Sequence, residues 1–332
     1  MLSAATSQRA AEPRFDVDSP LVACALAATR AAAVAAAGFA GRGDGKGADG
    51  AATAAMRSVL ADAPATGTVV TGEGAKDEAP MLADGELTGA PDAPSFEIAV
   101  DPLECTDFCA QGLAGALSTI AIAPIGSFWS PGPAFYMEKL VLPPAARDAA
   151  TLDDPPEAIV RKVAAALDRP VAELRVVILD KPRHAELAQR LRVLGAAVVM
   201  PTAGDVAGSL SVLLEDGDAD LLLGIGGTPE GVMTACAARA LGGGMQARVA
   251  PQRDNEREQV AAAGLSTTEI LDLEQLAAAD GAFVATGVTG GELLARPSRR
   301  GGSLTTESLV ITAASVRQIR QTSPIGSGPT GE

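Results

Sequence analysis

Short apolar runs alternate with helical stretches along most of the chain. Ser19 and Pro20 are typical of a helix N-terminus, and the apolar run behind them predicts a helix that ends at Gly38. A second helix is predicted from about Gly50 to Asp62. Further helices are predicted at 157–167, 184–194 and 230–241, and strands at 68–71, 96–100, 176–179, 196–200, 220–223, 282–285 and 309–312. This alternation predicts an α/β protein.

Polar ends and one internal break suggest how the chain is organised. Residues 1–18 and 321–332 are predicted to be polar tails. Aspartate and proline are frequent near 145–156, which makes this segment the candidate boundary between an N-terminal half (19–150) and a C-terminal half (151–320). The first residues contain no apolar core of a secretory signal, and Arg30 interrupts the apolar stretch that follows. We therefore expect a cytoplasmic protein that does not span a membrane.

Composition excludes several function classes. The chain has 26 Lys and Arg against 41 Asp and Glu, a net charge of −15, which argues against nucleic acid or an anionic membrane as partner. A single histidine, His184, argues against His-rich zinc sites. The four cysteines form no C-x-x-C pair and are expected to be reduced thiols, although Cys105 and Cys109, four residues apart, leave a redox-sensitive pair open.

Acidic residues follow three of the predicted strands: Glu73 the first, Asp101 and Glu104 the second, and Glu230 a later one. Ligands of open α/β sheets bind outside the carboxyl ends of the strands. Carboxylates without histidine suit Mg²⁺ or Mn²⁺, and a cation would compensate their mutual repulsion. The alternative is a purely structural role, in which Glu230 complements a helix dipole and Asp49 caps the second helix.

Glycine-rich and basic segments offer anion contacts. Three glycine-rich stretches could bind an anion through backbone N–H groups, but none completes a standard nucleotide-binding motif. They are 41–47, 224–227 and 286–291. Lys181 and Arg183 directly follow a predicted strand and would suit a phosphate, although a solvated basic turn explains them equally well.

Several longer segments occur in one order between about Leu21 and Arg320. They include 41–44, 48–52, 72–74, 77–82, 98–104 with Thr106, 136–140, 181–184, 204–206, 224–232, 285–289 and 305–309. Together these segments resemble class II fructose-1,6-bisphosphatases, whose bacterial and cyanobacterial members include enzymes acting on sedoheptulose 1,7-bisphosphate. The family belongs to the lithium-sensitive, metal-dependent sugar phosphatases, which carry an acid-Pro-aliphatic-acid-x-Thr segment like 101–106.

The resemblance implies a layered α/β sugar-phosphatase fold with the active site between two α/β halves. It implies hydrolysis of the 1-phosphate of a sugar bisphosphate with Mn²⁺ or Mg²⁺, in gluconeogenesis or the Calvin cycle, by a homodimer or homotetramer. The implied metal ligands are Asp49, Glu73, Asp101, Glu104 and Glu230. The implied catalytic residues are Thr106, Asp77 and Glu104, with Thr106 positioning or activating water. The implied substrate-binding residues are Glu104, Cys105, Thr106, Tyr136, Lys181, Arg183, Gly204, Asp205 and Gly227.

The chain departs from the family pattern at several supporting positions. Cys105 stands where the family has glycine, Ala75 where it has glutamate, and Ala203 where it has aspartate. Gly45 intervenes before Lys46, and residues 311–314 lack the usual arginine. These departures leave two alternatives open. One is a phosphatase for another sugar or inositol phosphate, and the other is an impaired paralogue that binds a sugar phosphate or a partner.

Overall fold

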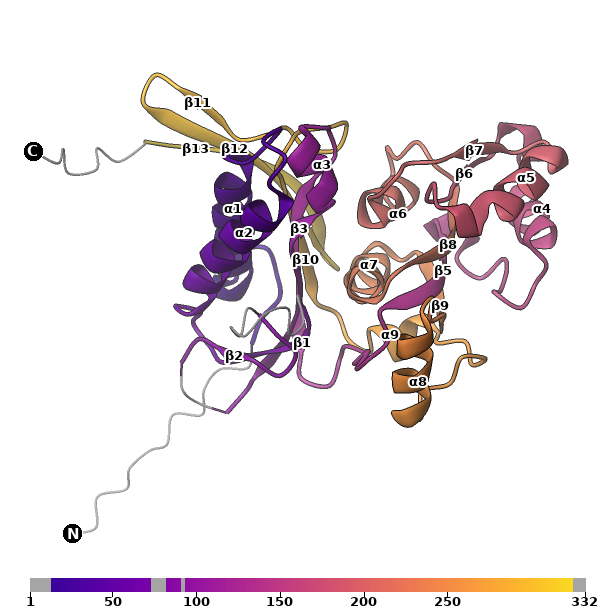
Figure 1. Ribbon diagram of the computed structural model, residues 1–332, viewed down its shortest axis with the longest axis horizontal. Coiled ribbons are helices and arrows are strands. Elements are labelled where there is room, and N and C mark those ends of the chain that lie inside the picture. Colours follow the sequence, from indigo (N-terminus) through magenta and orange to yellow (C-terminus); the bar gives the residue numbers. More distant parts are fainter. Residues whose placement is uncertain (1–12, 73–81, 91–92, 325–332) are drawn as a thin grey trace, which may run out of the picture.

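The computed structural model describes residues 13–72, 82–90 and 93–324 of the chain (Figure 1). The helices are α1 (Pro20–Ala37), α2 (Gly45–Leu60), α3 (Thr106–Gln111), α4 (Pro156–Ala166), α5 (Ala185–Leu194), α6 (Asp205–Leu213), α7 (Thr228–Leu241), α8 (Asp254–Ala262) and α9 (Leu273–Leu276). Short 3-10 turns are η1 (Pro144–Ala146), η2 (Val171–Glu173) and η3 (Pro182–His184). The strands are β1 (Gly67–Thr71), β2 (Leu87–Thr88), β3 (Phe96–Glu104), β4 (Leu117–Pro124), β5 (Tyr136–Leu142), β6 (Arg175–Val177), β7 (Ala197–Val199), β8 (Leu221–Gly227), β9 (Gly244–Val249), β10 (Ala282–Gly287), β11 (Ser298–Arg300), β12 (Ser303–Thr312) and β13 (Ser315–Pro324).

In the described residues, two mixed sheets alternate with layers of helices. The first sheet has the order β11-β12-β10-β4-β3-β1-β2, with β13 paired to β12, and the second has the order β7-β6-β8-β5-β9. Helices α1 and α2 cover the outer face of the first sheet, α6 and α7 lie between the sheets, and α4 and α5 cover the second sheet (Figure 1). The predicted layered α/β fold is confirmed.

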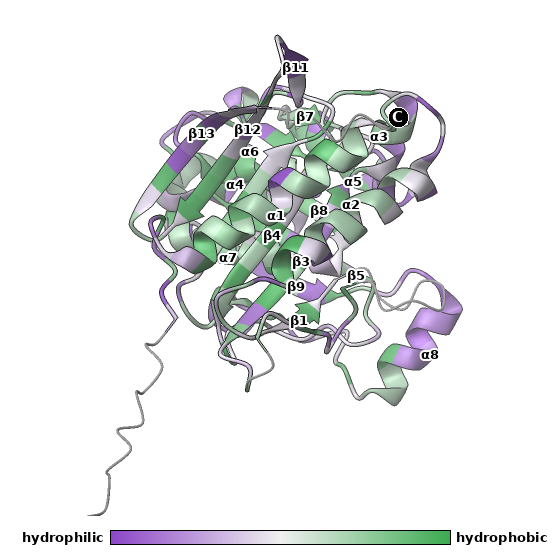
Figure 2. Ribbon diagram, turned by 90° about the vertical axis from the view of Figure 1, so that its left-hand side faces the viewer, coloured by the Kyte–Doolittle hydropathy of each residue, from purple (hydrophilic) through white to green (hydrophobic). Residues whose placement is uncertain are grey.

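Neighbouring residues of a strand point to opposite faces of its sheet and therefore pack against different helix layers. In β3, Ile98 and Val100 pack with α1 and α2, whereas Ala99 packs toward α7. In β5, Met137 joins the core around α6 and α7, whereas Leu140 joins the core beneath α4 and α5. Both sheets are therefore covered on both faces, as expected for strands with nearly continuous apolar runs. Figure 2 shows the green, hydrophobic core strands in contrast to α8, which is largely purple.

The starts of the first two helices follow from their caps. The predicted first helix is confirmed, and the Ser19 hydroxyl accepts a hydrogen bond from the N–H of Val22 (3.2 Å). The second helix begins earlier than predicted because the Asp44 carboxylate accepts a hydrogen bond from the N–H of Gly47 (2.8 Å). The interpretation of Asp49 as a helix cap is therefore wrong, since Asp49 lies inside α2.

Several strands differ from the prediction. β3 was expected to end at Val100 but continues through Glu104, with irregular pairing to β4 between Asp101 and Glu104. β8 likewise continues to Gly227. The sequence pattern did not predict β4, β5 or β9, although only β4 and β5 carry apolar residues on both faces, whereas β9 alternates between apolar residues and Gln246 or Arg248. β13 was missed because it is mostly polar, and it includes residues 321–324 of the predicted C-terminal tail.

Each sheet takes strands from both predicted halves. β5 precedes the proposed boundary at 145–156 but lies in the second sheet, while β10 to β13 complete the first sheet. The chain thus returns to its first sheet near the C-terminus. The division into halves at this boundary stays a prediction.

Helix α1 has the length and composition of a membrane span, a test that the core helix of a soluble protein also passes. Its residues Ala28, Ala32 and Ala36 are buried in the core between α2 and the first sheet. Arg30, also in α1, donates a hydrogen bond from Nε to the hydroxyl of Thr306 on β12 (2.8 Å). The helix therefore packs as a core element whose single charge reaches a polar partner.

Candidate active site

Glu104 ends β3 with only 3% of its surface exposed. Its Oε1 accepts a hydrogen bond from the N–H of Val206 (3.1 Å), while its buried Oε2 has no hydrogen-bond partner within the described part of the chain. Burial, reinforced by the negative charges of Asp205 and Glu230, raises the pKa of Glu104 well above its usual range. The Val206 N–H and the Lys139 ammonium oppose this rise in pKa. A buried carboxylate oxygen without a partner is costly, and a nearby cation would relieve that cost.

Asp205 opens α6 directly after Gly204, whose backbone is left-handed (φ +95°). Lys139 on β5 donates a hydrogen bond to Asp205 Oδ2 (2.5 Å), and both side chains are buried. A Cβ at Gly226 on β8 would lie 2.0 Å from the same oxygen. Glycine at position 226 therefore provides the space in which the ion pair forms.

Glu230 lies in the first turn of α7, which follows Gly227. A Cβ at Gly227 would lie 2.0 Å from Glu230 Oε2, so the carboxylate folds back over this glycine. A negative charge at a helix N-terminus is favourable by itself. The helical position of Glu230 thus agrees with both of its predicted roles, as a dipole partner and as a metal ligand.

Three more of the predicted residues lie on β3, α3 and α2. Asp101 on β3 accepts a hydrogen bond from the N–H of Leu103 (3.1 Å), and the Thr106 hydroxyl at the start of α3 donates to the carbonyl oxygen of Leu103 (3.0 Å). Asp49 lies about one turn into α2, whose first residue, Gly45, packs against Thr106. A Cβ at Gly45 would lie 3.2 Å from Thr106 Cγ2.

Cys105 joins β3 to α3 in a left-handed conformation (φ +62°, ψ +50°). This conformation costs an L-residue about 1–2 kcal/mol and costs glycine almost nothing. A Cβ at Gly204 would lie 3.4 Å from Cys105 Sγ, so the thiol faces the left-handed turn before α6. The glycine that the resemblance implies at position 105 would thus suit this backbone conformation.

The pKa of the Cys105 thiol reflects the negative charges around it. Burial raises its pKa, and four surrounding acids raise it further, so the thiol is protonated at neutral pH. These acids are Glu104, Asp101, Asp205 and Glu230. Cys105 and Cys109 are separate thiols in the structure.

The metal site is only partly covered by the described residues. Glu73 and Asp77, predicted as a ligand and a catalytic residue, lie outside them. Among the described residues, no three His, Cys, Asp or Glu side chains lie close enough together to hold a metal ion. The donor set nevertheless suits Mg²⁺ or Mn²⁺, because it consists of carboxylates, and the unsatisfied Glu104 Oε2 fits a nearby positive charge.

On the second sheet, Arg183 and Tyr136 come together. The Arg183 guanidinium lies over the Tyr136 ring, 5.2 Å from its centroid, and also donates a hydrogen bond to the carbonyl oxygen of Ile225 (2.8 Å). Tyr136 pairs with Gly227 across β5 and β8, and Lys181 immediately precedes η3. These residues therefore form a basic edge whose geometry is fixed by backbone contacts.

His184 is part of the same edge but is structural. Its Nδ1 lies 2.8 Å from the carbonyl oxygen of Leu179, and its Nε2 accepts a hydrogen bond from the N–H of Ile225 (2.8 Å). Burial lowers its pKa, and the nearby cations Arg183 and Lys181 lower it further. With both ring nitrogens engaged, the only histidine is unsuited to act as a general base.

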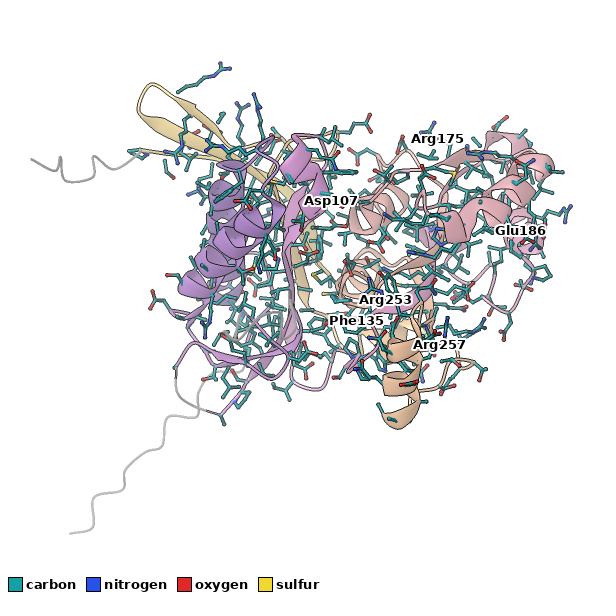
Figure 3. All side chains as sticks on the ribbon, in the orientation of Figure 1. Asp107, Phe135, Arg175, Glu186, Arg253 and Arg257 are labelled. Atoms are coloured by element: carbon teal, nitrogen blue, oxygen red, sulfur yellow. The ribbon has the colours of Figure 1, made fainter. Side chains whose placement is uncertain are left out.

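Sequence reasoning missed two residues that support this region, Lys139 and Glu256. Glu256 on α8 accepts hydrogen bonds from the N–H groups of Phe135 (2.8 Å) and Tyr136 (3.0 Å), which fixes the start of β5. Phe135 itself is exposed (Figure 3). The available signal for Lys139 was a lysine on the same face of β5 as the apolar residues Met137 and Val141. Glu256 carried no comparable signal, because it is one of several acidic residues on a polar helix.

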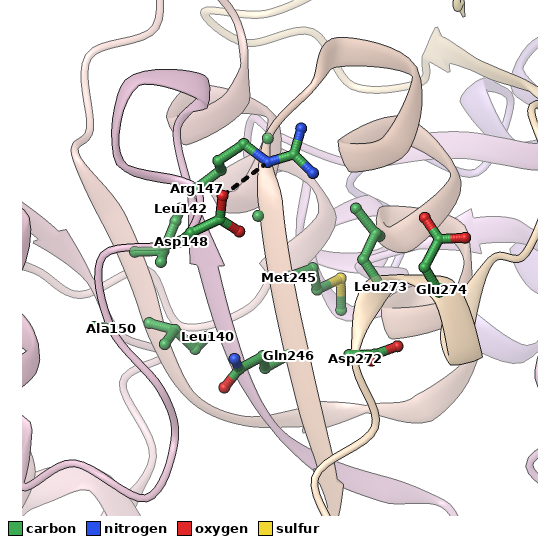
Figure 4. Close-up of a pocket in the computed structure, with 12 residues that line it drawn as sticks. Leu140, Leu142, Arg147, Asp148, Ala150, Met245, Gln246, Asp272, Leu273 and Glu274 are labelled. Atoms are coloured by element: carbon green, nitrogen blue, oxygen red, sulfur yellow. Dashed lines mark ion pairs between the residues drawn. The ribbon is translucent and has the colours of Figure 1, made fainter.

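A cavity of about 200 Å³ lies at the opposite end of β5 (Figure 4). Leu140, Leu142 and Gln246 line it together with the ion pair Arg147–Asp148 (3.4 Å). None of the predicted site residues lines this cavity. The candidate site is therefore the region around Cys105 and not this cavity.

Fold and site together define the class: a layered α/β protein with buried acids that suit a divalent cation and a basic edge that suits an anion. Residues 20–323 match the family of bacterial fructose-1,6-bisphosphatases described as glpX-encoded. The chain is 41% identical over 307 residues to fructose-1,6-bisphosphatase 1 class 2 of Escherichia coli strain K12, covering 88% of this chain and 91% of that protein. Fructose-1,6-bisphosphatase class 2 of Shigella flexneri matches with the same identity and coverage. The chain belongs to the bacterial fructose-1,6-bisphosphatase family.

Proposed function

We propose that this protein hydrolyses the 1-phosphate of fructose 1,6-bisphosphate and releases fructose 6-phosphate and phosphate, with Mn²⁺ or Mg²⁺ as cofactor. The observation that carries the proposal is the Glu104 carboxylate, which is buried near Asp205 and Glu230 with an unsatisfied oxygen. Membership of the fructose-1,6-bisphosphatase family supports both the reaction and the substrate.

The acidic residues would hold the metal ions. The proposed ligands are Asp49, Glu73, Asp101, Glu104 and Glu230. Bound divalent ions would lower the pKa of the attacking water and neutralise charge on the phosphoryl group. Thr106 would orient this water, with Asp77 as the further catalytic residue. Because the Thr106 hydroxyl donates to the Leu103 carbonyl, it is left to accept a hydrogen bond from the water.

The second sheet would hold the sugar and the phosphate that is not removed. Arg183 can bind a phosphate in bidentate fashion, with Lys181 as a second charge and Tyr136 as a ring that orients the guanidinium. Asp205 would accept hydrogen bonds from sugar hydroxyls. Backbone groups would complete the contact at Cys105, Gly204 and Gly227.

Two observations favour alternative functions. Ala203 removes an acid that the family uses next to Asp205, which favours a different sugar phosphate or an inositol phosphate as substrate. The left-handed backbone of Cys105 favours an impaired paralogue, since the strain lies beside the site.

A cytoplasmic location and a homodimeric or homotetrameric assembly also belong to the proposal.

Phosphate release by the purified protein tests these functions. The substrates are fructose 1,6-bisphosphate, sedoheptulose 1,7-bisphosphate, fructose 6-phosphate and inositol 1-phosphate, each with Mn²⁺ or Mg²⁺ and with Glu104→Ala as the blank. Turnover of a bisphosphate that disappears in the blank supports the proposal. Turnover of a monophosphate alone supports the first alternative, and no turnover by a folded protein that binds Mn²⁺ supports the impaired paralogue.

A further inference from the structure

Lys139 is a buried cation that the proposed mechanism does not use. Only 1% of its surface is exposed, and it points with Met137 and Val141 of β5 toward the layer that holds α6 and α7. Its ammonium donates a hydrogen bond to Asp205 Oδ2 (2.5 Å). Burying an ammonium is unfavourable even when it is paired, and apolar side chains of similar volume often serve stability better. A role in the site explains its presence better than a role in stability.

The ion pair lies at the point where α6 connects the two sheets. Asp205 binds Lys139 of the second sheet, and the next residue, Val206, donates its N–H to Glu104 Oε1 of the first sheet (3.1 Å). Because residues 205 and 206 are consecutive, a movement of the ion pair displaces both contacts. The fit is close, since a Cβ at Gly226 would lie 2.0 Å from Asp205 Oδ2 and 3.1 Å from the Lys139 ammonium.

We propose that Lys139 is a positioning residue for the sugar-bisphosphate site. By engaging Asp205 Oδ2, it fixes the carboxylate plane and keeps Oδ1 oriented to accept a hydrogen bond from the sugar. Lys139 acts through Asp205 and is not assigned a contact with substrate. The inference rests on the proposed function, because the ligand is taken to be a sugar bisphosphate.

The test is a double-mutant cycle with Lys139→Met and Asp205→Asn. In the full-length Mn²⁺ enzyme, Lys139→Met is expected to raise KM for fructose 1,6-bisphosphate about tenfold and to change kcat by less than about threefold. The double variant is expected to match Asp205→Asn alone, because the lysine acts only through the aspartate. Lys162→Met is the matched control, since exposed Lys162 pairs with Asp154 in the same way (2.6 Å) and should leave both constants unchanged.

A merely structural lysine gives a different result. It would lower the active fraction and hence kcat, while KM stays at the wild-type value, and this outcome overturns the inference. Additive losses in the double variant overturn it as well. If Lys139→Met does not fold, Lys139→Gln keeps a hydrogen-bond donor without the charge and is measured in its place. An inactive wild-type enzyme shows that the proposed function has failed, whereas an active wild type with unchanged variants shows that only this inference has failed.

Discussion

The two sides of the candidate site are built differently. On the first sheet, Glu104 is buried with an oxygen that no described residue satisfies, and nearby negative charges raise its pKa. On the second sheet, Arg183 and His184 bind backbone groups, and Arg183 also lies over the Tyr136 ring. The first side is left electrostatically unfavourable, whereas the second is already satisfied by the protein itself.

This difference shows which part of the site depends on a positive charge that a ligand would have to supply. An unsatisfied buried carboxylate destabilises the protein unless a cation or a proton compensates it. A guanidinium fixed by a carbonyl oxygen and a ring is organised before any ligand arrives, which favours affinity. Changes on the first side should therefore alter turnover and metal-dependent stability, and changes on the second side should alter KM.

Glu104→Gln should have the largest effect. The amide keeps the shape of the side chain but loses the charge that a divalent ion requires, so kcat/KM should fall at least about a hundredfold. Phosphate release with saturating Mn²⁺ measures the loss. Glu97→Gln is the matched control, because Glu97 is also buried on β3 but lies at the other end of the strand, where its carboxylate accepts hydrogen bonds from backbone N–H groups such as that of Ser127 (2.9 Å). Equal activity of Glu104→Gln and the wild type would remove Glu104 from the mechanism.

The pH dependence of stability should separate the two sides in chelator-treated protein. The pKa of Glu104 is raised on folding, so its contribution is fully present below its unfolded pKa of 4.5 and is lost as pH rises through the folded pKa. Glu104→Gln should therefore be more stable than the wild type at pH 7–8, by about 1–3 kcal/mol, with the difference vanishing near pH 4.5. Denaturant unfolding at several pH values measures this change.

His184 should change the free energy of unfolding with pH in the opposite direction to Glu104. Its pKa is lowered by burial, so folding favours the neutral ring, and its contribution to stability is lost as pH falls below the unfolded value of 6.5. In the Glu104→Gln background this loss should persist, and His184→Gln should remove it. If the slope below pH 6.5 is the same with and without His184, the buried ring is not its source.

On the second side, Arg183→Lys should raise KM for fructose 1,6-bisphosphate about tenfold, with a smaller change in kcat. Lysine keeps the charge but cannot bind a phosphate in bidentate fashion or present a planar group to Tyr136. Steady-state kinetics measure the effect, and Arg190→Lys, at an exposed pair with Glu157 (2.7 Å), is the control. A fall in kcat at constant KM would place Arg183 on the catalytic side of the comparison.

The sequence predicted the elements and residues of the site better than the contacts between them. The α/β class followed from the alternation of elements, whereas the layered arrangement and the acids and cations of the site were named by the resemblance. The Lys139–Asp205 contact could not be predicted, because it joins residues 66 positions apart and depends on the space at Gly226. The structural role of His184 was equally hidden, since both of its partners are backbone groups. Local patterns predict elements, whereas such contacts arise only when the two sheets pack.

Cys105→Gly should have the smallest effect, a change in stability that comes from the backbone conformation at position 105. The backbone at this position has φ +62°, so removing the Cβ should stabilise the protein by about 1 kcal/mol. Cys105→Ala also removes the thiol but keeps the Cβ in the same conformation, so it should give no such gain. Thermal unfolding of the two variants therefore separates backbone strain from the chemistry of the sulfur. If glycine and alanine stabilise the chain equally, the sulfur atom itself, rather than the left-handed turn, makes Cys105 unfavourable.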